Sequence, residues 1–469
     1  MKVLLINVCL RNETEKKIFP VGLGYIASAV YEAGFDMEIL DIDLHRYSDQ
    51  ELEENLRNKE FDVVGLGCIV TGYKIVKDIC AMIKRVNKDA IIVVGNSVAS
   101  SIPTTLLSHT QADIAVIGEG DVTIVELLRH LSKRESLEAA SGIYFKKNGK
   151  IIPTKPRAAI SNLDSLPLPR WDLFEINMYI QESKKYVNEP YPLPKEQIKA
   201  IPVNTARGCV FSCTFCYHVF KEYKYRWRSP ASVVSEIKEA KKRFGINYVD
   251  FWDELTFFKR EQAEAFVDAL IKEDVGIFWT ASCRANLFRG PEDLQLAKKI
   301  KKAGCIGLGY SLESANTNIL NAMHKMITKE MFLAQKKTLD DAGIVTWTSL
   351  VFGYPEETEE TVNETMEFCY ENDVYPSAGF LLPQPGTPIY EKMFERGIVK
   401  DEEDYLLQMG DRQDLRISLS NIPAQDLMAL VNKHLRRINA KMGLNLAEEK
   451  LIKSGHYRAK EKVKDGKKI

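Results

Sequence analysis

Three cysteines stand close together near the middle of the chain, at Cys209, Cys213 and Cys216. The spacing C-x3-C-x2-C puts three thiolates on one short loop, near enough to hold one metal cluster. A closed structural zinc site uses four protein ligands, and ferredoxin-type clusters are also held by four cysteines. A [4Fe–4S] cluster with three thiolates keeps one iron free to bind a substrate. The loop therefore predicts an iron–sulfur cluster with an open coordination position.

Two other interpretations of this loop are open. A zinc site would need a fourth ligand nearby, which His218 could supply. A disulfide with one spare thiol fits poorly, because nine cysteines is an odd number and no secretory signature is present. The other six cysteines are scattered among apolar residues, and we expect them to be buried small hydrophobic side chains: Cys9, Cys68, Cys80, Cys283, Cys305 and Cys369.

With the aromatic Phe215 directly before the last cysteine, the loop resembles the signature of the radical S-adenosylmethionine enzymes. The resemblance implies that the open iron is chelated by the amino and carboxylate groups of S-adenosylmethionine. It also implies reductive cleavage of that molecule to a 5′-deoxyadenosyl radical, with an electron donor of the flavodoxin or ferredoxin type. A thiolate cluster needs a reducing setting.

Composition narrows the class of protein. A length of 469 residues predicts two or three domains, and 45% hydrophobic with 28% charged residues is typical of a globular chain. The net charge of −1 argues against nucleic acid or an anionic membrane as partner. The start, Met1–Asn7, is too short for a signal sequence, and four prolines within Val374–Tyr390 argue against a membrane span. We expect a cytoplasmic protein with a small-molecule substrate.

Residues 1–140 alternate short apolar runs with amphipathic stretches, which predicts a flavodoxin-like, doubly wound parallel α/β sheet in the order 2-1-3-4-5. The expected strands are Val3–Asn7, Met37–Asp41, Asp62–Gly65, Ile91–Gly95 and Asp113–Ile117. The expected helices are Gly22–Ala33, Asp49–Lys59, Lys74–Val86, Thr104–Ser108 and Thr123–Ser132. Ligands of such sheets bind at the carboxyl ends of the strands.

Three of these strand ends are rich in glycine and hydroxyl residues, at Gly65–Thr71, Gly95–Ser101 and Gly118–Gly120. Together they resemble the cobalamin-binding domain that precedes the barrel in a large class of radical S-adenosylmethionine enzymes. The resemblance implies cobalamin contacts from Thr71, Gly95, Ser97, Gly118, Glu119 and Gly120. A vestigial domain that packs on the barrel and binds nothing is the competing interpretation.

The chain departs from the histidine-on cobalamin motif, D-x-H-x-x-G, which should follow the first strand. Cys9–Asn12 stands there instead, and the similar Asp43–Ser48 follows the second strand. We therefore expect His45 to be solvent-exposed and cobalamin to lack a lower histidine ligand. A methylthiotransferase would need three further cysteines for a second cluster, and Cys80 falls within the apolar pattern of a helix. Nor does the C-terminus resemble the small β-barrel of those enzymes.

A hairpin with Asn148-Gly149 at its turn and a proline-containing connector, Leu163–Pro169, predict a hairpin and linker over residues 141–195. Six strand-like runs separated by helix patterns then predict a partial (β/α)6 barrel over residues 196–395: Ala200–Thr205, Tyr248–Trp252, Ile277–Ser282, Cys305–Ser311, Val345–Val351 and Ser377–Leu382. The cysteine loop follows the first of them, so the cluster is expected at the carboxyl rim. Residues 396–469 predict a small helical region, with Ala424–Met442 as a cap near the substrate and a basic tail from Lys450.

Other rim residues can be assigned from the resemblance. It implies that Asp253 or Glu254, after the second strand, binds the methionine amino group, and that Glu313 and Ser314 lie in the ribose and carboxylate contact region. Arg284, after the third strand, is expected to bind the methionine carboxylate, with a solvated loop arginine as the alternative.

The leading functional hypothesis is cobalamin-dependent methylation of an unactivated carbon. Radical oxidative cyclisation or rearrangement could use the same parts. A non-catalytic corrinoid-binding protein is the alternative from another class.

Overall fold

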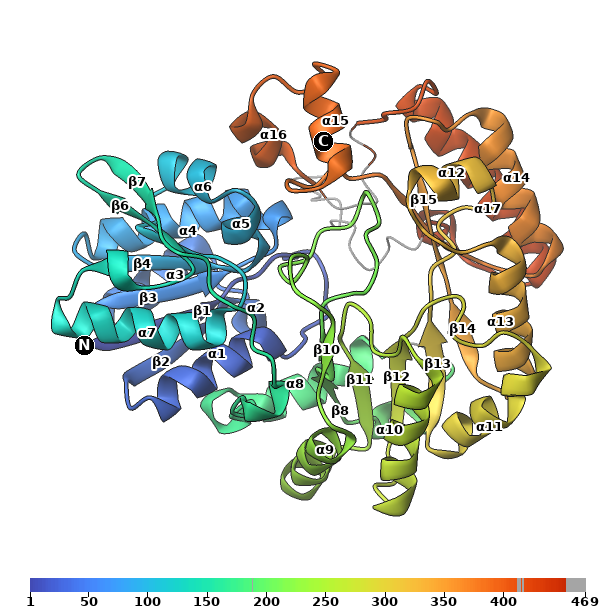
Figure 1. Ribbon diagram of the computed structural model, residues 1–469, viewed down its shortest axis with the longest axis horizontal. Helices are drawn as coiled ribbons and strands as arrows, with labels where there is room; N and C mark the ends of the chain where they lie inside the picture. Colours follow the sequence, from blue (N-terminus) through green and yellow to red (C-terminus); the bar gives the residue numbers. More distant parts are fainter. Residues whose placement is uncertain (188, 411–414, 416, 453–469) are drawn as a thin grey trace.

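The computed structural model describes all residues except 188, 411–414, 416 and 453–469. Two α/β units lie side by side, the N-terminal one built on one large sheet and the second curved like part of a barrel (Figure 1). Most of the predicted basic tail, from residue 453 on, lies outside the described residues. Among the described helices, none is long and apolar enough to cross a bilayer.

The N-terminal sheet has the order β2-β1-β3-β4-β5-β6-β7. Its five parallel strands confirm the predicted 2-1-3-4-5 order: β1 Lys2–Asn7, β2 Asp36–Asp41, β3 Val63–Gly67, β4 Ile91–Gly95 and β5 Ile114–Val116. The predicted hairpin, β6 Ile143–Lys147 and β7 Lys150–Pro153, pairs antiparallel with β5. The hairpin thus extends this sheet, whereas the sequence analysis placed it in the linker. Pairing covers the β5 edge and buries Ile143 and Phe145.

Helices cover both faces of this sheet because its strands are apolar on both sides. In β1, Val3 and Leu5 join one hydrophobic cluster and Leu4 and Ile6 the other, as strand alternation requires. The first cluster holds α1 Val21–Glu32 and α7 Gly120–Lys133. The second holds α3 Asp49–Arg57, α4 Tyr73–Val86 and α6 Pro103–His109. Full burial of each such leucine or isoleucine stabilises the fold by about 1.5–3 kcal/mol.

Some short helices escaped the sequence analysis, among them α8 Ile176–Glu182 in the predicted linker. Asp41 caps α2 Ile42–His45 by accepting from the Leu44 amide. The strand-end segment after β4 forms α5 Asn96–Ser101 in place of a loop.

The second unit has five parallel strands in the order β14-β13-β12-β11-β8, plus the parallel pair β15-β16. Their bounds are β8 Ala200–Val203, β11 Tyr248–Phe251, β12 Phe278–Ser282, β13 Cys305–Gly309, β14 Val345–Trp347, β15 Ser349–Phe352 and β16 Ser377–Phe380. The predicted six βα units are present, and the fifth strand is divided at Thr348. Its first half pairs with β13 and its second half with β16. The intervening helices are α9 Pro230–Phe244, α10 Arg260–Lys272, α11 Leu294–Lys302, α12 Thr317–Ala322, α13 Lys329–Asp341 and α14 Glu359–Glu371.

The C-terminal helices are α15 Pro388–Glu395, α16 Glu402–Gln408 and α17 Ala424–Met442. The expectation that α17 caps the substrate is wrong. It packs along α14 on the outside of the barrel, because Leu427, Val431 and Leu435 bury one apolar face there. Instead, α16 reaches the N-terminal unit, where Glu403 accepts from the Tyr73 hydroxyl at 3.0 Å and pairs with Lys77 at 2.5 Å.

Candidate active site

The three cysteines lie on the loop between β9 Ala206–Arg207 and β10 Arg226–Trp227. These two short strands pair antiparallel and close the base of the loop. The loop, green in Figure 1, rises between the two units from the carboxyl end of β8. The chain therefore brings the predicted cluster ligands to the barrel rim on the side that faces the N-terminal sheet.

Hydrogen bonds hold the cysteine loop at its middle. Thr214 donates its amide to the Met323 carbonyl at 3.0 Å and its hydroxyl to the Ala322 carbonyl at 3.0 Å. Its hydroxyl oxygen also lies 2.7 Å from the Tyr354 hydroxyl. Phe215 packs edge-to-face on the same tyrosine, with ring centroids 6.3 Å apart. The loop is thus anchored to the segment after β13 and to the turn after β15.

Asp253 and Glu254 hold the start of the loop. One carboxylate oxygen of Asp253 accepts from the amides of Thr205, at 2.8 Å, and Ala206, at 3.0 Å; the other accepts from the Thr205 hydroxyl at 2.7 Å. Glu254 accepts from the Gly208 amide at 3.3 Å. The oxygens of Asp253 thus brace the strand before Cys209, and the prediction that Asp253 or Glu254 binds the methionine amino group stays a prediction.

Arg284 lies against the cysteine loop and is only 7% exposed, so it is not the solvated arginine of the alternative interpretation. Its Nη2 donates to the carbonyls of Lys325, at 2.6 Å, and Met326, at 2.7 Å. The guanidinium carbon lies 3.1 Å from the centroid of the Phe211 ring. Within the described residues, its buried Nε has no hydrogen-bond partner. Burial lowers the pKa of Arg284 to about 10, against the opposing charges of Cys213 and Cys209.

Lys325, which the sequence analysis missed, pairs with Glu313 at 2.8 Å. Burial lowers its pKa, but the charges of Glu313 and Cys213 outweigh burial and raise it. The second oxygen of Glu313, Oε2, is buried and has no partner in the described part of the chain. Nothing in the local sequence marked Lys325, because it follows the short helix α12 and not a strand.

Strained backbone accompanies this side of the site. Glu313, His324 and Met326 have φ angles of 64°, 53° and 54°, in the left-handed region that side chains other than glycine rarely adopt. Such residues cost on the order of 1 kcal/mol or more each and cluster at functional sites. The His324 carbonyl approaches the Cys213 Sγ at 4.0 Å, the Met326 carbonyl accepts from Arg284, and Glu313 pairs with Lys325.

These residues fit an iron–sulfur cluster with an amino-acid ligand. Burial raises the pKa of all three thiols, to about 12 for Cys216, so they need bound metal to exist as thiolates at neutral pH. The positive charges of Arg284 and Lys325 oppose burial, because they lower the pKa of the Cys209 and Cys213 thiols. Among the buried polar atoms that have no partner in the described chain, Arg284 Nε is a donor and Glu313 Oε2 an acceptor, which match a carboxylate and an ammonium group.

A single-ion zinc site is less well matched. Among the described residues, no three His, Cys, Asp or Glu side chains gather as one metal ion requires. A [4Fe–4S] cluster distributes its ligands over different iron atoms and does not need them to meet at one point.

A cavity of about 460 Å³ opens on the inner face of the barrel strands. Its lining includes Tyr186, Tyr248, Asp250, Trp252, Thr280, Ser282 and Trp347. Asp250 accepts from the Thr280 hydroxyl at 2.6 Å and from the Trp252 indole at 2.5 Å. The hydroxyl of Tyr186 is buried and lacks a partner among the residues described. Ile18, in the loop after β1, packs against the hydrophobic cluster that contains Tyr186 and Tyr248, two residues of the cavity lining.

Alternation along β11 could have revealed part of this lining. Tyr248 and Asp250 line the cavity, whereas Val249 packs into the hydrophobic core on the other face of the strand. Ser314, by contrast, is 1% exposed and its hydroxyl lies 3.0 Å from that of Thr365, so it braces the rim and does not face the cavity.

The predicted cobalamin-contacting residues divide into two groups. The strand ends after β3 and β4 stay accessible: Thr71 is half-buried, and a Cβ on Gly95 would meet no atom within 4 Å. Ser97 is buried and accepts from the Val70 amide at 2.8 Å, which ties these two strand ends together. An open glycine backbone beside a braced loop fits the close approach of a large planar ligand.

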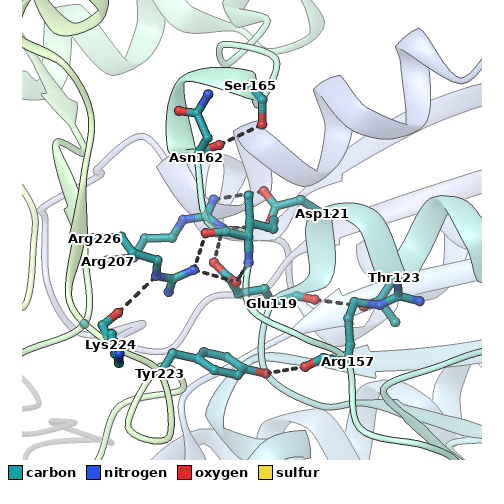
Figure 2. Close-up of polar contacts among 12 residues, drawn as sticks. Glu119, Asp121, Thr123, Arg157, Asn162, Ser165, Arg207, Tyr223, Lys224 and Arg226 are labelled. Carbon is teal, nitrogen blue, oxygen red and sulfur yellow. Dashed lines mark hydrogen bonds and ion pairs between the residues drawn. The ribbon is translucent and has the colours of Figure 1, made fainter.

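The third strand end, after β5, lies against the second unit. A Cβ on Gly118 would lie 2.4 Å from the Tyr223 hydroxyl oxygen, and one on Gly120 would lie 2.9 Å from Ile26. Glu119 is 4% exposed and pairs with Arg207 and Arg226 of the second unit (Figure 2). This segment therefore contacts the second unit, and its predicted contacts to cobalamin stay a prediction.

His45 is exposed, as expected, with Nε2 2.5 Å from Glu175. Five of the six other cysteines are buried, which confirms the packing interpretation for Cys68, Cys80, Cys283, Cys305 and Cys369. Cys9 is half-buried and accepts from Arg46 at 2.8 Å.

Comparison with known proteins agrees with this arrangement. Residues 8–128 match the B12 binding domain, and residues 203–369 match the Radical SAM superfamily. An uncharacterized methyltransferase of Pyrococcus horikoshii is 29% identical over 79% of this chain and 78% of its own length. The anaerobic magnesium-protoporphyrin IX monomethyl ester cyclase of Rubrivivax gelatinosus is 27% identical over 82% of this chain and 68% of its own length.

Among solved structures, the fold is similar to that of the radical S-adenosylmethionine methyltransferase TsrM from Kitasatospora setae, with cobalamin and a [4Fe–4S] cluster bound. The TM-score is 0.66 at 20% identity, over 84% of this chain and 75% of that one. The cysteine loop at the barrel rim, the accessible strand ends facing it and the two domain matches lead to one conclusion. The chain is a radical S-adenosylmethionine enzyme with an N-terminal B12-binding domain.

Proposed function

We propose that this protein transfers a methyl group to an unactivated carbon of a small molecule, with S-adenosylmethionine as the radical source and cobalamin as the methyl carrier. The observation that carries this proposal is the position of the cysteine loop. It lies between the barrel cavity and the N-terminal sheet, with Tyr223 packed on Gly118 of that sheet. Radical generation and methyl delivery would thus reach the same cavity from two sides.

The residues have distinct roles in this proposal. Cys209, Cys213 and Cys216 would hold the cluster, and Thr71, Gly95 and the backbone after β3 and β4 would face the corrinoid. When bound, the cluster supplies the electron that cleaves S-adenosylmethionine, and the corrinoid supplies the methyl group.

Arg284 would bind the methionine carboxylate through its unpartnered Nε, and Glu313 would accept from the methionine ammonium through Oε2. Lys325 neutralises the other oxygen of Glu313. Asp253 and Thr214 would act indirectly, because their hydrogen bonds hold the cysteine loop in place before any ligand binds.

The barrel cavity would orient the substrate carbon and exclude water. Trp252, Trp347 and Tyr248 supply apolar walls, and Asp250 and the free Tyr186 hydroxyl supply polar contacts. We further propose a reducing cytoplasmic setting and a flavodoxin- or ferredoxin-type donor, since thiolate-held clusters of low potential need both.

Methyl-labelled S-adenosylmethionine tests the reaction type on the anaerobically reconstituted enzyme with reductant and hydroxocobalamin. Methyl transfer predicts labelled methylcobalamin and S-adenosylhomocysteine in addition to 5′-deoxyadenosine. Formation of 5′-deoxyadenosine alone would favour the second candidate, ring closure, which the similarity to the cyclase supports. Retained function in Cys213→Ala would instead favour a non-catalytic corrinoid-binding protein.

A further inference from the structure

Four charged side chains from the two units form one buried cluster, the interdomain charge cluster (Figure 2). Glu119 and Asp121 come from the start of α7, and Arg207 and Arg226 come from β9 and β10. Arg207 lies 2.9 Å from Glu119 and contacts both oxygens of Asp121, at 2.8 and 2.9 Å. Arg226 lies 2.8 Å from the other oxygen of Glu119. Both acids are at most 5% exposed.

Both arginines belong to the base of the cysteine loop. Arg207 precedes Cys209 by two residues. Arg226 is the direct antiparallel partner of Arg207. Glu119 therefore contacts both strands from which the loop rises. The loop itself completes the contact, because the Phe220 ring lies within 6.0 Å of both guanidinium groups.

The linker passes through the same contact. The Ile160 amide donates to Glu119 at 2.7 Å, and the Ile160 carbonyl accepts from Arg226 at 2.7 Å. Two carboxylates thus face two guanidinium groups in a buried, neutral set. Loss of the Glu119 charge alone would leave Arg226 without its carboxylate and Arg207 with Asp121 only.

We infer that Glu119 is a positioning residue that fixes the edge of the B12-binding domain against the base of the cluster loop. The inference rests on the proposed function, because it concerns the separation of the two cofactors that this function requires. Glu119 sits directly after β5, next to the accessible strand ends, while its partners lead straight into the cluster ligands. It touches no reacting atom, so its role is geometric.

The test uses the holoenzyme with the corrinoid as cob(II)alamin and the cluster reduced. Magnetic interaction between the two paramagnetic centres splits or broadens their EPR signals, and it falls with the cube of their separation. We expect one well-defined interaction in the wild type. Glu119→Gln should spread it over several separations, with at least half of the resolved interaction lost at unchanged iron and corrinoid content.

Glu126→Gln is the matched control, because Glu126 is on the same helix and pairs with the Arg157 guanidinium, whereas Arg157 contacts Tyr223 of the cysteine loop through its backbone carbonyl. It should leave the interaction unchanged. Arg226→Lys keeps the charge and gives a milder second variant, expected to fall between wild type and Glu119→Gln.

Hydrogen exchange on the same samples reports whether the contact has opened, in residues 118–121 and 204–228. Faster exchange in Glu119→Gln with an unaltered EPR interaction would overturn the inference, since the contact would then be structural only. A wild type with both cofactors loaded but no interaction would overturn it too. A wild type that binds no corrinoid would refute the proposed function itself.

Discussion

Arg284→Lys tests the proposed methionine site most directly. Lysine keeps the positive charge but has a methylene carbon at the place of Nε, the donor that lacks a partner in the described chain. A hydrogen bond to a charged group contributes about 1.5–3 kcal/mol, so loss of one should weaken S-adenosylmethionine binding about 10- to 100-fold. The lysine ammonium can still donate to the Lys325 and Met326 carbonyls, which limits any structural damage.

Anaerobic equilibrium dialysis of labelled S-adenosylmethionine with the reconstituted enzyme measures this loss. Arg260→Lys is the matched control, since Arg260, the first residue of α10, pairs with Asp293 directly before α11, and its substitution should change binding by less than about twofold. Equal affinity of wild type and Arg284→Lys, with intact clusters in both, would refute the assignment of Arg284 to the carboxylate.

Three further predictions concern the cluster, the loop and pH. Cys213→Ser should lower bound iron well below about four atoms per chain after reconstitution, measured by iron and sulfide analysis. Asp253→Asn loses acceptor capacity toward Thr205 and Ala206, and should speed exchange of those two amides while leaving the α17 amides unchanged. Burial raises the pKa of Glu357 from 4.5 to about 7, so between these pH values the folded state binds a proton that the unfolded state does not. The free energy of unfolding therefore falls by up to about 3 kcal/mol as the pH rises from 4.5 through 7. Glu357→Gln should therefore be more stable than wild type at pH 8 in urea titrations and equal to it near pH 4; equal stability at pH 8 would contradict this.

Local patterns sufficed for much of the fold. The alternation of apolar runs and amphipathic stretches predicted the 2-1-3-4-5 sheet and the six βα units, because strand and helix periodicities are properties of neighbouring residues. The same patterns missed α5, since a glycine- and serine-rich segment carries no apolar periodicity. They also mistook α17 for a cap, because an amphipathic helix shows that one face is buried but not against which partner.

The sequence by itself indicated the chemistry: three cysteines at fixed spacing, on a loop that follows a barrel strand, predict the cluster ligands. Only the tertiary structure decided which polar residues serve ligands and which serve the protein. Glu119, Asp253 and Ser314 looked like ligand contacts, yet each is bound by groups distant in sequence. Lys325 was invisible, yet it lies beside Glu313. The reason is physical. The hydrogen-bonding capacity that a side chain has left for a ligand depends on which protein groups folding brings within hydrogen-bond distance. Those groups come from other strands and from the other domain.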